Sequence, residues 1–124
     1  MTRTKERSEF LTDVLVTAVE GGIGYWAEAK DYTLGSDRSE GERDRYASAM
    51  VREADDYEVG PWRSLTLATI ERGIRRLAGG QYTLNNTMLG WILSASATND
   101  ATDIDSDCAD IIVQVALLDS IVYG

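Results

Sequence analysis

Residues 20–26, with the sequence EGGIGYW, hold the densest group of side chains in this chain that could bind a ligand. A carboxylate and two aromatic rings flank three glycines. Each glycine loses extra backbone entropy on folding, so such a segment is costly for a simple turn. We predict that Tyr25 and Trp26 frame a pocket and that the backbone near Gly22 is open to a ligand. Glu20 would then recognise a hydroxyl or an amine. The alternative is a helix C-cap followed by a crowded crossing of two chain segments.

A tryptophan and several arginines in residues 62–76 form a second candidate site. A nucleotide-like ligand needs an aromatic ring that stacks on its base and a guanidinium that holds its phosphate. The predicted ligand-binding residues of this region are Trp62, Arg63, Arg72 and Arg76. Arg72 and Arg76 fall on one face of a predicted helix, opposite its apolar stripe. The alternative is a solvated helix face whose arginines interact with the negative end of the helix dipole.

The chain contains no histidine and a single cysteine, Cys108. Without histidine, Ser-His-Asp and Cys-His nucleophiles and most zinc sites are excluded. Residues 103–110 resemble the start of a calcium-binding loop, but Cys108 replaces the turn glycine and Gln114 stands where the bidentate glutamate belongs. We therefore predict no metal site and no cofactor. Asp105 is interpreted as a helix N-cap and Cys108 as a small packed residue.

Charge and hydropathy limit the class of partner. The chain has 21 acidic and 12 basic residues, a net charge of −9, and Arg76 is its last basic residue. An acidic surface disfavours direct binding to nucleic-acid phosphates. No apolar run approaches the roughly 18 residues of a membrane-spanning helix, and residues 1–7 lead into an amphipathic segment instead of the apolar core of a signal peptide. We expect a cytoplasmic protein that binds neither membranes nor nucleic acid directly.

Hydrophobic periodicity predicts an α+β fold in a single domain, residues 1–124. The predicted sheet is small and antiparallel, with two or three strands. Residues 1–7 are predicted to be flexible and residues 35–44 to form a polar loop. In chain order the predicted elements are a helix over residues 8–20 capped by Ser8, strands over 23–33 and 46–53, a short third strand before Pro61, and three helices over 67–78, 85–97 and 106–119.

Two features of the predicted helices are specific. Thr66 is the predicted N-cap of the helix over 67–78, and Asp105 that of the helix over 106–119. The last helix is apolar on nearly every side, so we predict that it is the central element of the core.

A strand that begins at Ile23 would separate the two aromatic residues of the glycine-rich segment. Ile23, Tyr25 and Ala27 would share its apolar face, so Tyr25 is predicted to be buried and Trp26 to be accessible. Trp26→Ala is then expected to spare folding and to impair binding.

Three stretches together resemble a family of small, uncharacterised proteins encoded by phages, prophages and plasmids. They are residues 13–26, which contain EGGIGYW, residues 62–66, which read WRSLT, and residues 105–124, which contain ADIIVQVAL and end in VYG. The chain departs from the pattern at residues 118–120, where Leu-Asp-Ser replaces Phe-Gly-Glu. The resemblance implies a phage-type genomic setting and no established biochemical activity.

Three functional hypotheses follow. The first, which we favour, is a non-enzymatic, phage-type accessory protein in counter-defence that sequesters a nucleotide-derived small molecule or binds a host defence protein. Its ligand would lie in one pocket formed by Tyr25, Trp26, Trp62 and an arginine, which a homodimer could complete. The second is an acidic protein–protein inhibitor or nucleic-acid mimic, which the base-free residues 77–124 suggest. The third is a carboxylate-based hydrolase that uses Glu20 with Asp105, Asp107 or Asp110.

Overall fold

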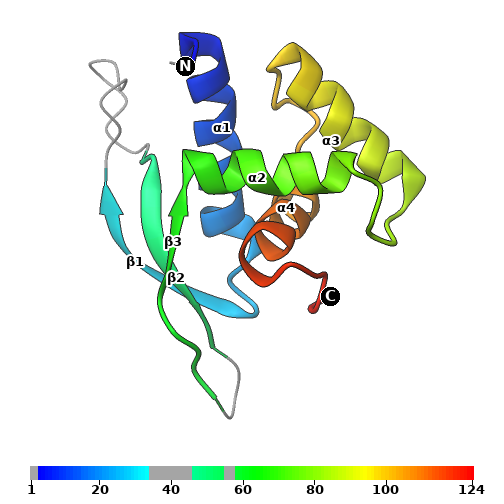
Figure 1. The fold of residues 1–124 in the computed structure, drawn as a ribbon. Helices are drawn as coiled ribbons and strands as arrows, with labels where there is room; N and C mark the ends of the chain where they lie inside the picture. The colour runs from blue at the N-terminus through cyan, green and yellow to red at the C-terminus, as the bar shows by residue number, and fades with distance from the viewer. Residues whose placement is uncertain (1–2, 34–45, 55–57) are drawn as a thin grey trace.

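The computed structural model describes residues 3–33, 46–54 and 58–124 (Figure 1). The predicted α+β class is confirmed, with an N-terminal helix, a three-stranded antiparallel sheet and three later helices. The predicted loop over 35–44 lies outside the described residues. In chain order the elements are α1 (Lys5–Thr17), a π-helical turn η1 (Ala18–Gly22), β1 (Ala27–Thr33), β2 (Ser48–Glu53), β3 (Arg63–Thr66), α2 (Leu67–Ala78), α3 (Asn86–Thr98) and α4 (Ser106–Leu118).

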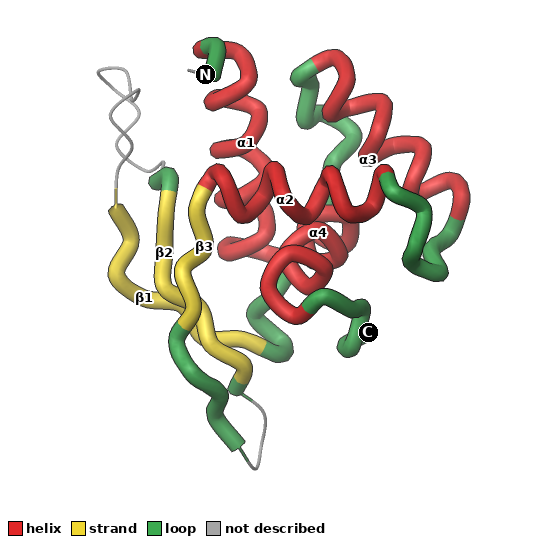
Figure 2. The backbone as a smooth tube through the Cα atoms, viewed as in Figure 1, coloured by secondary structure: helices red, strands yellow, loops and turns green. Residues whose placement is uncertain are grey.

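The sheet has the strand order β1-β2-β3 and lies to one side of the helices (Figures 1 and 2). Strand alternation puts Ala49, Val51 and Leu65 on the face toward the helices, where all three are buried. Met50 and Arg52 consequently point to the open face. The edge strand β1 loses its register between Lys30 and Thr33, where Asp31 adopts a φ of 54°.

The central core element is α4, as predicted. Asp105 caps it by accepting a hydrogen bond from the Cys108 backbone N–H at 2.8 Å, which confirms the predicted N-cap. Helix α2 has the predicted bounds and a capping box between Thr66 and Thr69. It crosses α4 at Gly73, where a Cβ atom would lie 2.4 Å from the carbonyl oxygen of Ile112, so only glycine permits this close approach.

The predictions for the N-terminal part are wrong at both ends of the helix. Helix α1 begins at Lys5 because Thr4, not Ser8, is its N-cap and accepts a hydrogen bond from the Arg7 backbone N–H at 3.1 Å. Residues 5–7 are therefore part of the helix. The helix also continues to Gly22, because the N–H of Ile23 donates to the carbonyl of Ala18 and so closes a π-helical turn.

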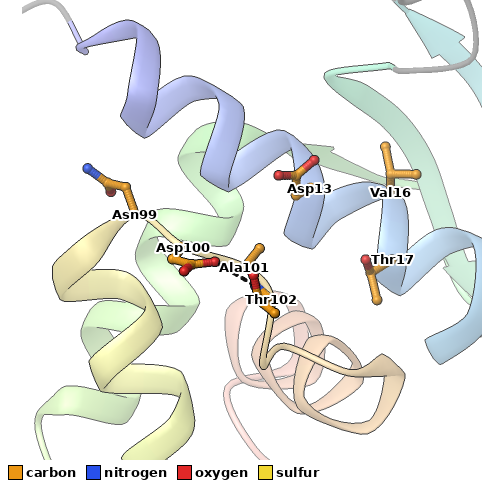
Figure 3. A pocket seen from close by; sticks show the side chains of 7 residues that line it. All are labelled: Asp13, Val16, Thr17, Asn99, Asp100, Ala101 and Thr102. Atoms are coloured by element: carbon orange, nitrogen blue, oxygen red, sulfur yellow. Dashed lines mark hydrogen bonds between the residues drawn. The ribbon is translucent and has the colours of Figure 1, made fainter.

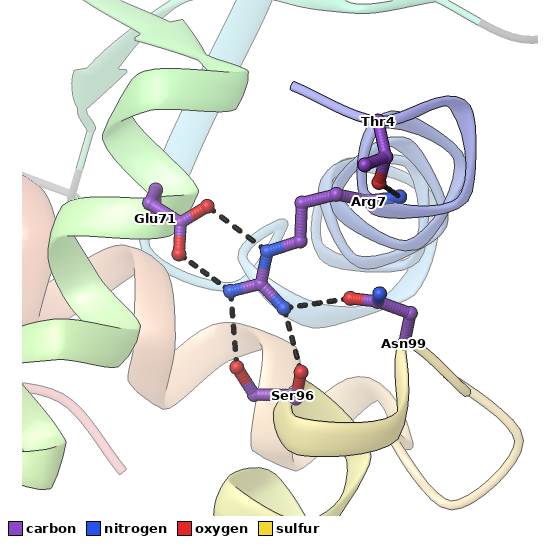
Figure 4. A network of polar contacts seen from close by, with 5 residues as sticks. All are labelled: Thr4, Arg7, Glu71, Ser96 and Asn99. Atoms are coloured by element: carbon purple, nitrogen blue, oxygen red, sulfur yellow. Dashed lines mark hydrogen bonds and ion pairs between the residues drawn. The ribbon is translucent and has the colours of Figure 1, made fainter. Parts of the chain in front are cut away.

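Arg7 joins three helices through its guanidinium group (Figure 4). It forms a two-pronged ion pair with Glu71 of α2, at 3.0 Å from Nε to Oε2 and 2.5 Å from Nη2 to Oε1. Nη1 donates to the Ser96 carbonyl at 2.7 Å and to Asn99 Oδ1 at 2.9 Å. The hydrogen bonds from Arg7 hold the pKa of Glu71 below its ordinary value. The end of α3 is thus fixed to α1 and α2.

Apart from this end, α3 packs against the other elements less than any other described helix does. Only Ile92 and Ala95 are buried in it, and Trp91 is 46% exposed. Among the described residues, no helix has both the length and the apolar character needed to cross a membrane.

Candidate functional site

The glycine-rich segment ends in a turn, and this reverses the predicted orientation of its aromatic residues. The N–H groups of Trp26 and Ala27 both donate to the Ile23 carbonyl, at 3.0 and 2.9 Å, so β1 begins only at Ala27. Trp26 is 2% exposed and Tyr25 is 60% exposed. The prediction that Tyr25 is buried and Trp26 accessible is wrong because it extended strand alternation into a turn.

Asp110 of α4 holds both aromatic residues. Its Oδ1 accepts from Trp26 Nε1 at 2.8 Å, and its Oδ2 accepts from Tyr25 Oη at 2.5 Å. Gln114, one turn later, donates Nε2 to Asp110 Oδ1 at 2.9 Å. These three neutral donors compensate for the burial of Asp110, which is 6% exposed. Burial and the bond to Asp110 raise the pKa of Tyr25 to about 12.

Residues 121–124, which we call the tail, complete this cluster. Gln114 Oε1 accepts from the backbone N–H groups of Val122 and Tyr123, at 2.8 and 2.9 Å, and Nε2 donates to the Tyr123 carbonyl at 3.2 Å. The Tyr123 ring stacks on Trp26 with 5.1 Å between centroids and 6° between planes. We call Tyr25, Trp26, Asp110, Gln114 and Tyr123 the aromatic corner. Tyr123 therefore covers a face of the Trp26 ring on which a ligand would otherwise stack.

Glu20 and Gly22 have structural partners beside this corner. Tyr46, which is 9% exposed, donates its hydroxyl to Glu20 Oε1 at 3.0 Å, and burial together with Glu20 raises the pKa of Tyr46. The hydroxyl that Glu20 contacts is therefore supplied by the protein itself. A Cβ atom on Gly22 would lie 2.8 Å from the carbonyl oxygen of Ser106. Gly22 thus allows η1 to cross the first turn of α4, which agrees with the crowded-crossing interpretation.

Three of the predicted anion-binding residues gather at the C-terminal end of α4. Arg72 Nη2 donates to the Ala116 carbonyl at 3.0 Å and Arg76 Nη1 to the Val115 carbonyl at 3.0 Å. Arg63 Nη1 reaches the Leu117 carbonyl at 3.5 Å. Carbonyls in the last turn of a helix lack intrahelical partners and form the negative end of its dipole. The hydrogen bonds of these arginines therefore go to the negative end of the α4 dipole.

Trp62 lies apart from the other predicted residues, on the open face of the sheet. Its ring centroid is 4.2 Å from Lys30 Nζ and 4.5 Å from Arg52 Cζ. Arg52 also pairs with Glu28, at 2.7 Å from Nη2 to Oε2. We call Lys30, Arg52 and Trp62 the sheet-face cluster. Trp26 contacts α4 on the other side of the sheet, so Tyr25, Trp26, Trp62 and an arginine do not assemble into one pocket.

An open pocket of about 600 Å³ lies between α1 and the connection from α3 to α4 (Figure 3). Within it, Asp100 accepts hydrogen bonds from the backbone N–H of Thr102 at 3.0 Å and from its hydroxyl at 2.5 Å, and these bonds lower the pKa of Asp100. Two carboxylates make the pocket better suited to a cationic group than to a phosphate. None of the predicted site residues lines it; the lining residues are Asp13, Val16, Thr17, Asn99, Asp100, Ala101 and Thr102.

Three of the four carboxylates of the hydrolase hypothesis hold part of the fold. Glu20 binds Tyr46, Asp105 caps α4 and Asp110 binds the aromatic residues of the corner. Cys108 is fully buried, and burial raises the pKa of its thiol to about 12. Within residues 3–33, 46–54 and 58–124, no three histidine, cysteine, aspartate or glutamate residues are grouped so that they could hold a metal ion.

Sequence reasoning missed Gln114 and Tyr123 in the aromatic corner and Lys30 and Arg52 on the sheet. Asp110 and Gln114 could have been found, because two polar residues spaced i, i+4 in an otherwise apolar helix indicate a buried hydrogen-bonded pair. Tyr123 offers no such local signal. The corner does unite the two longest stretches of the family-like pattern, residues 13–26 and 105–124.

Comparison of the chain with protein-family models found no match. Searches of curated proteins and of solved structures likewise found no significant match.

Proposed function

We propose that this chain is a non-enzymatic, phage-type accessory protein that acts in the host cytoplasm by sequestering a nucleotide-derived small molecule. A role in counter-defence accords with the genomic setting that the resemblance implies. Capture of a host factor is the second form of the same proposal.

The sheet-face cluster is the observation that carries the small-molecule form. It places one aromatic ring within 4.5 Å of two cationic groups on an open face, where Arg52 is paired with Glu28 and Lys30 supplies the second cation. A nucleotide-derived anion uses this combination, because its base stacks on a ring and its phosphates pair with cations. A cationic cluster also attracts an anion locally on a chain whose net charge is −9.

Isothermal titration against cyclic dinucleotides and ADP-ribose-type signals tests this form. We expect heat of binding with at least one of these ligands, and its loss in Trp62→Ala and in Lys30→Gln. Trp91→Ala is the matched control, because it removes another tryptophan that lies outside the cluster. The small-molecule form is wrong if the folded protein gives no heat with any ligand, or if both tryptophan variants bind equally well.

The host-factor form is supported by a separate set of exposed acidic residues. They lie in the connection from α3 to α4 and in the first turn of α4, and are Asp100, Asp103, Asp105 and Asp107. With the acidic pocket beside them, they suit a basic surface on a partner protein, as an acidic inhibitor requires.

Salt dependence separates the host-factor form from the small-molecule form. A partner bound through Asp103 and Asp107 should be captured at low salt and released at high salt, because exposed charges are screened. Replacing both residues with asparagine should weaken capture, whereas Trp62→Ala should leave it unchanged. Capture that does not respond to salt would contradict an electrostatic interface.

A further inference from the structure

Helix α3 presents a continuous face that no other part of the described chain covers. Its buried residues, Ile92 and Ala95, lie on one side. The opposite side, which the 3.6-residue period brings together, is exposed throughout. We call it the α3 face; it consists of Thr87, Gly90, Trp91, Ser94, Ala97 and Thr98.

The α3 face is free of charge on a strongly charged molecule. Residues 77–99 contain no acidic and no basic residue, although the chain as a whole carries 33 charged side chains, 21 acidic and 12 basic. An exposed helix face normally carries charged residues, which keep it solvated. The α3 face lacks them: it consists of small residues and hydroxyl side chains around Trp91, which is 46% exposed.

No contact among the described residues requires glycine at position 90, in the middle of this face. A Cβ atom built on it meets nothing within 4 Å, unlike one built on Gly73, which would strike α4. Glycine also lowers helix propensity at an exposed helical position. It does permit another helix backbone to come close, as do Ser94 and Ala97 on the same face.

We propose that the α3 face binds the α3 face of a second copy, so that the two helices pack antiparallel about an axis between Gly90 and Ser94. Two copies that each carry a net charge of −9 repel each other. An uncharged face is the surface through which they can meet with the least repulsion. A two-fold axis also brings the same residues together from both copies, as an isologous dimer requires.

The charges at the two ends of α3 favour the antiparallel arrangement. Asp100 follows the C-cap Asn99, and both Asp100 and Asp103 are exposed. The start of α3 is the positive end of its dipole and has no acidic residue in its first turn. An antiparallel pair sets the acidic end of each helix against the positive end of the other, whereas a parallel pair sets the acidic ends together. The proposal is independent of any ligand at the sheet-face cluster.

Sedimentation velocity and light scattering over a wide concentration range test the association. We expect the wild-type chain to reach twice the mass of one copy, and Gly90→Arg to remain at the mass of one copy. Gly90→Arg should fold, because its side chain enters open space; a circular-dichroism melt checks this. Ala68→Arg adds the same charge at an exposed position of α2 and should remain a dimer.

The result can overturn the proposal in two ways. A wild-type chain that is monomeric at every concentration would leave the α3 face to a different partner. A dimer that survives Gly90→Arg, or one that Ala68→Arg disrupts equally, would place the interface elsewhere.

Disulfide trapping tests the direction of packing. In an antiparallel pair centred between Gly90 and Ser94, residue 87 of one copy lies opposite residue 97 of the other. A mixture of Thr87→Cys and Ala97→Cys should therefore crosslink on oxidation, whereas each variant alone should not. The native Cys108 is fully buried and does not interfere. Crosslinking of each variant with itself would instead indicate a parallel pair and would contradict the arrangement proposed.

Discussion

Helices α3 and α4 have the same length of 13 residues and are both largely apolar, yet their surroundings differ completely. α4 buries eight residues, among them the polar Asp110 and Gln114, while α3 buries two. Asp110 binds Trp26, and Gln114 binds the tail. Gly73 and Gly22 let neighbouring helices approach α4. α3 itself contains Gly90, and a Cβ atom built there meets nothing within 4 Å. Apolar composition is therefore common to a buried and an exposed helix, and the buried, hydrogen-bonded pair Asp110 and Gln114 distinguishes α4.

The largest expected effect comes from removing one tryptophan from each environment. Trp26→Ala deletes a buried ring and its bond to Asp110, and should lower the free energy of unfolding by about 3–5 kcal/mol. Trp91→Ala on α3, measured at a dilution where the protein is monomeric, should change it by less than about 1 kcal/mol, since surface substitutions cost little. Denaturant unfolding of both variants measures the difference. Equal losses would mean that α3 is as tightly packed as α4.

The two helix glycines should respond to alanine with opposite signs. Gly73→Ala forces a methyl group against the α4 backbone and should cost about 3 kcal/mol, at the upper end for overpacking. Gly90→Ala should stabilise the chain by about 0.5–1 kcal/mol, because alanine favours a helix and the site has room. Thermal melts at a dilution where the protein is monomeric compare the two. Destabilisation by Gly90→Ala under these conditions would show an unseen contact.

Gln114→Leu should detach the tail from α4. The substitution leaves the N–H groups of Val122 and Tyr123 without their acceptor and should cost about 2 kcal/mol, the usual penalty for such losses. Hydrogen exchange at these two amides should accelerate more than exchange in α2. Thr87→Leu is the matched control, an exposed polar-to-leucine change on α3 that should leave both amides protected. If amide exchange at residues 122 and 123 is unchanged in Gln114→Leu, then Gln114 does not hold the tail.

The smallest effect concerns alkaline pH. The pKa of Tyr25 is raised from 10.0 to about 12, so the fold favours its neutral phenol. The stability from this preference is complete below pH 10 and is lost as the pH rises toward 12. Tyr25→Phe should cost about 1 kcal/mol at neutral pH and should reduce this alkaline loss. Unfolding between pH 8 and 12 compares the variant with the wild type. All other tyrosines are present in both chains, so the difference between the two curves reports on Tyr25. Parallel curves would contradict the link between Tyr25 and Asp110.

Local sequence predicted the elements whose determinants are local. Thr66 and Asp105 cap helices through residues three positions away, so their N-caps were predictable. Periodicity located α2, and apolar residues on nearly every side of α4 indicated its central role. The start of α1 was missed because Thr4 and Ser8 are both residue types that can cap a helix, and the sequence alone did not distinguish between them.

The candidate site was less predictable because its contacts join distant residues. The α2 arginines were predicted to bind a ligand, with the dipole of their own helix as the alternative, whereas their hydrogen bonds go to carbonyls of α4, some 40 positions later. The orientation of Tyr25 and Trp26 depends on Asp110 and on a turn that composition does not distinguish from a strand. Lys30 and Arg52 meet Trp62 only because of the sheet register.

The docking of the tail also sets the order in which the molecule can fold. Strands β1, β2 and β3 pair with neighbours in the chain, so the sheet closes comparatively short loops. The bond from Trp26 to Asp110 closes a loop of 84 positions, and the stacking of Tyr123 on Trp26 closes a longer one. Contacts between such distant residues form slowly. On a ribosome, which makes the chain from its N-terminus, Trp26 stays without these partners until nearly all of this sequence has emerged. We therefore expect the burial of that ring by residues 121–123 to be among the last steps of folding.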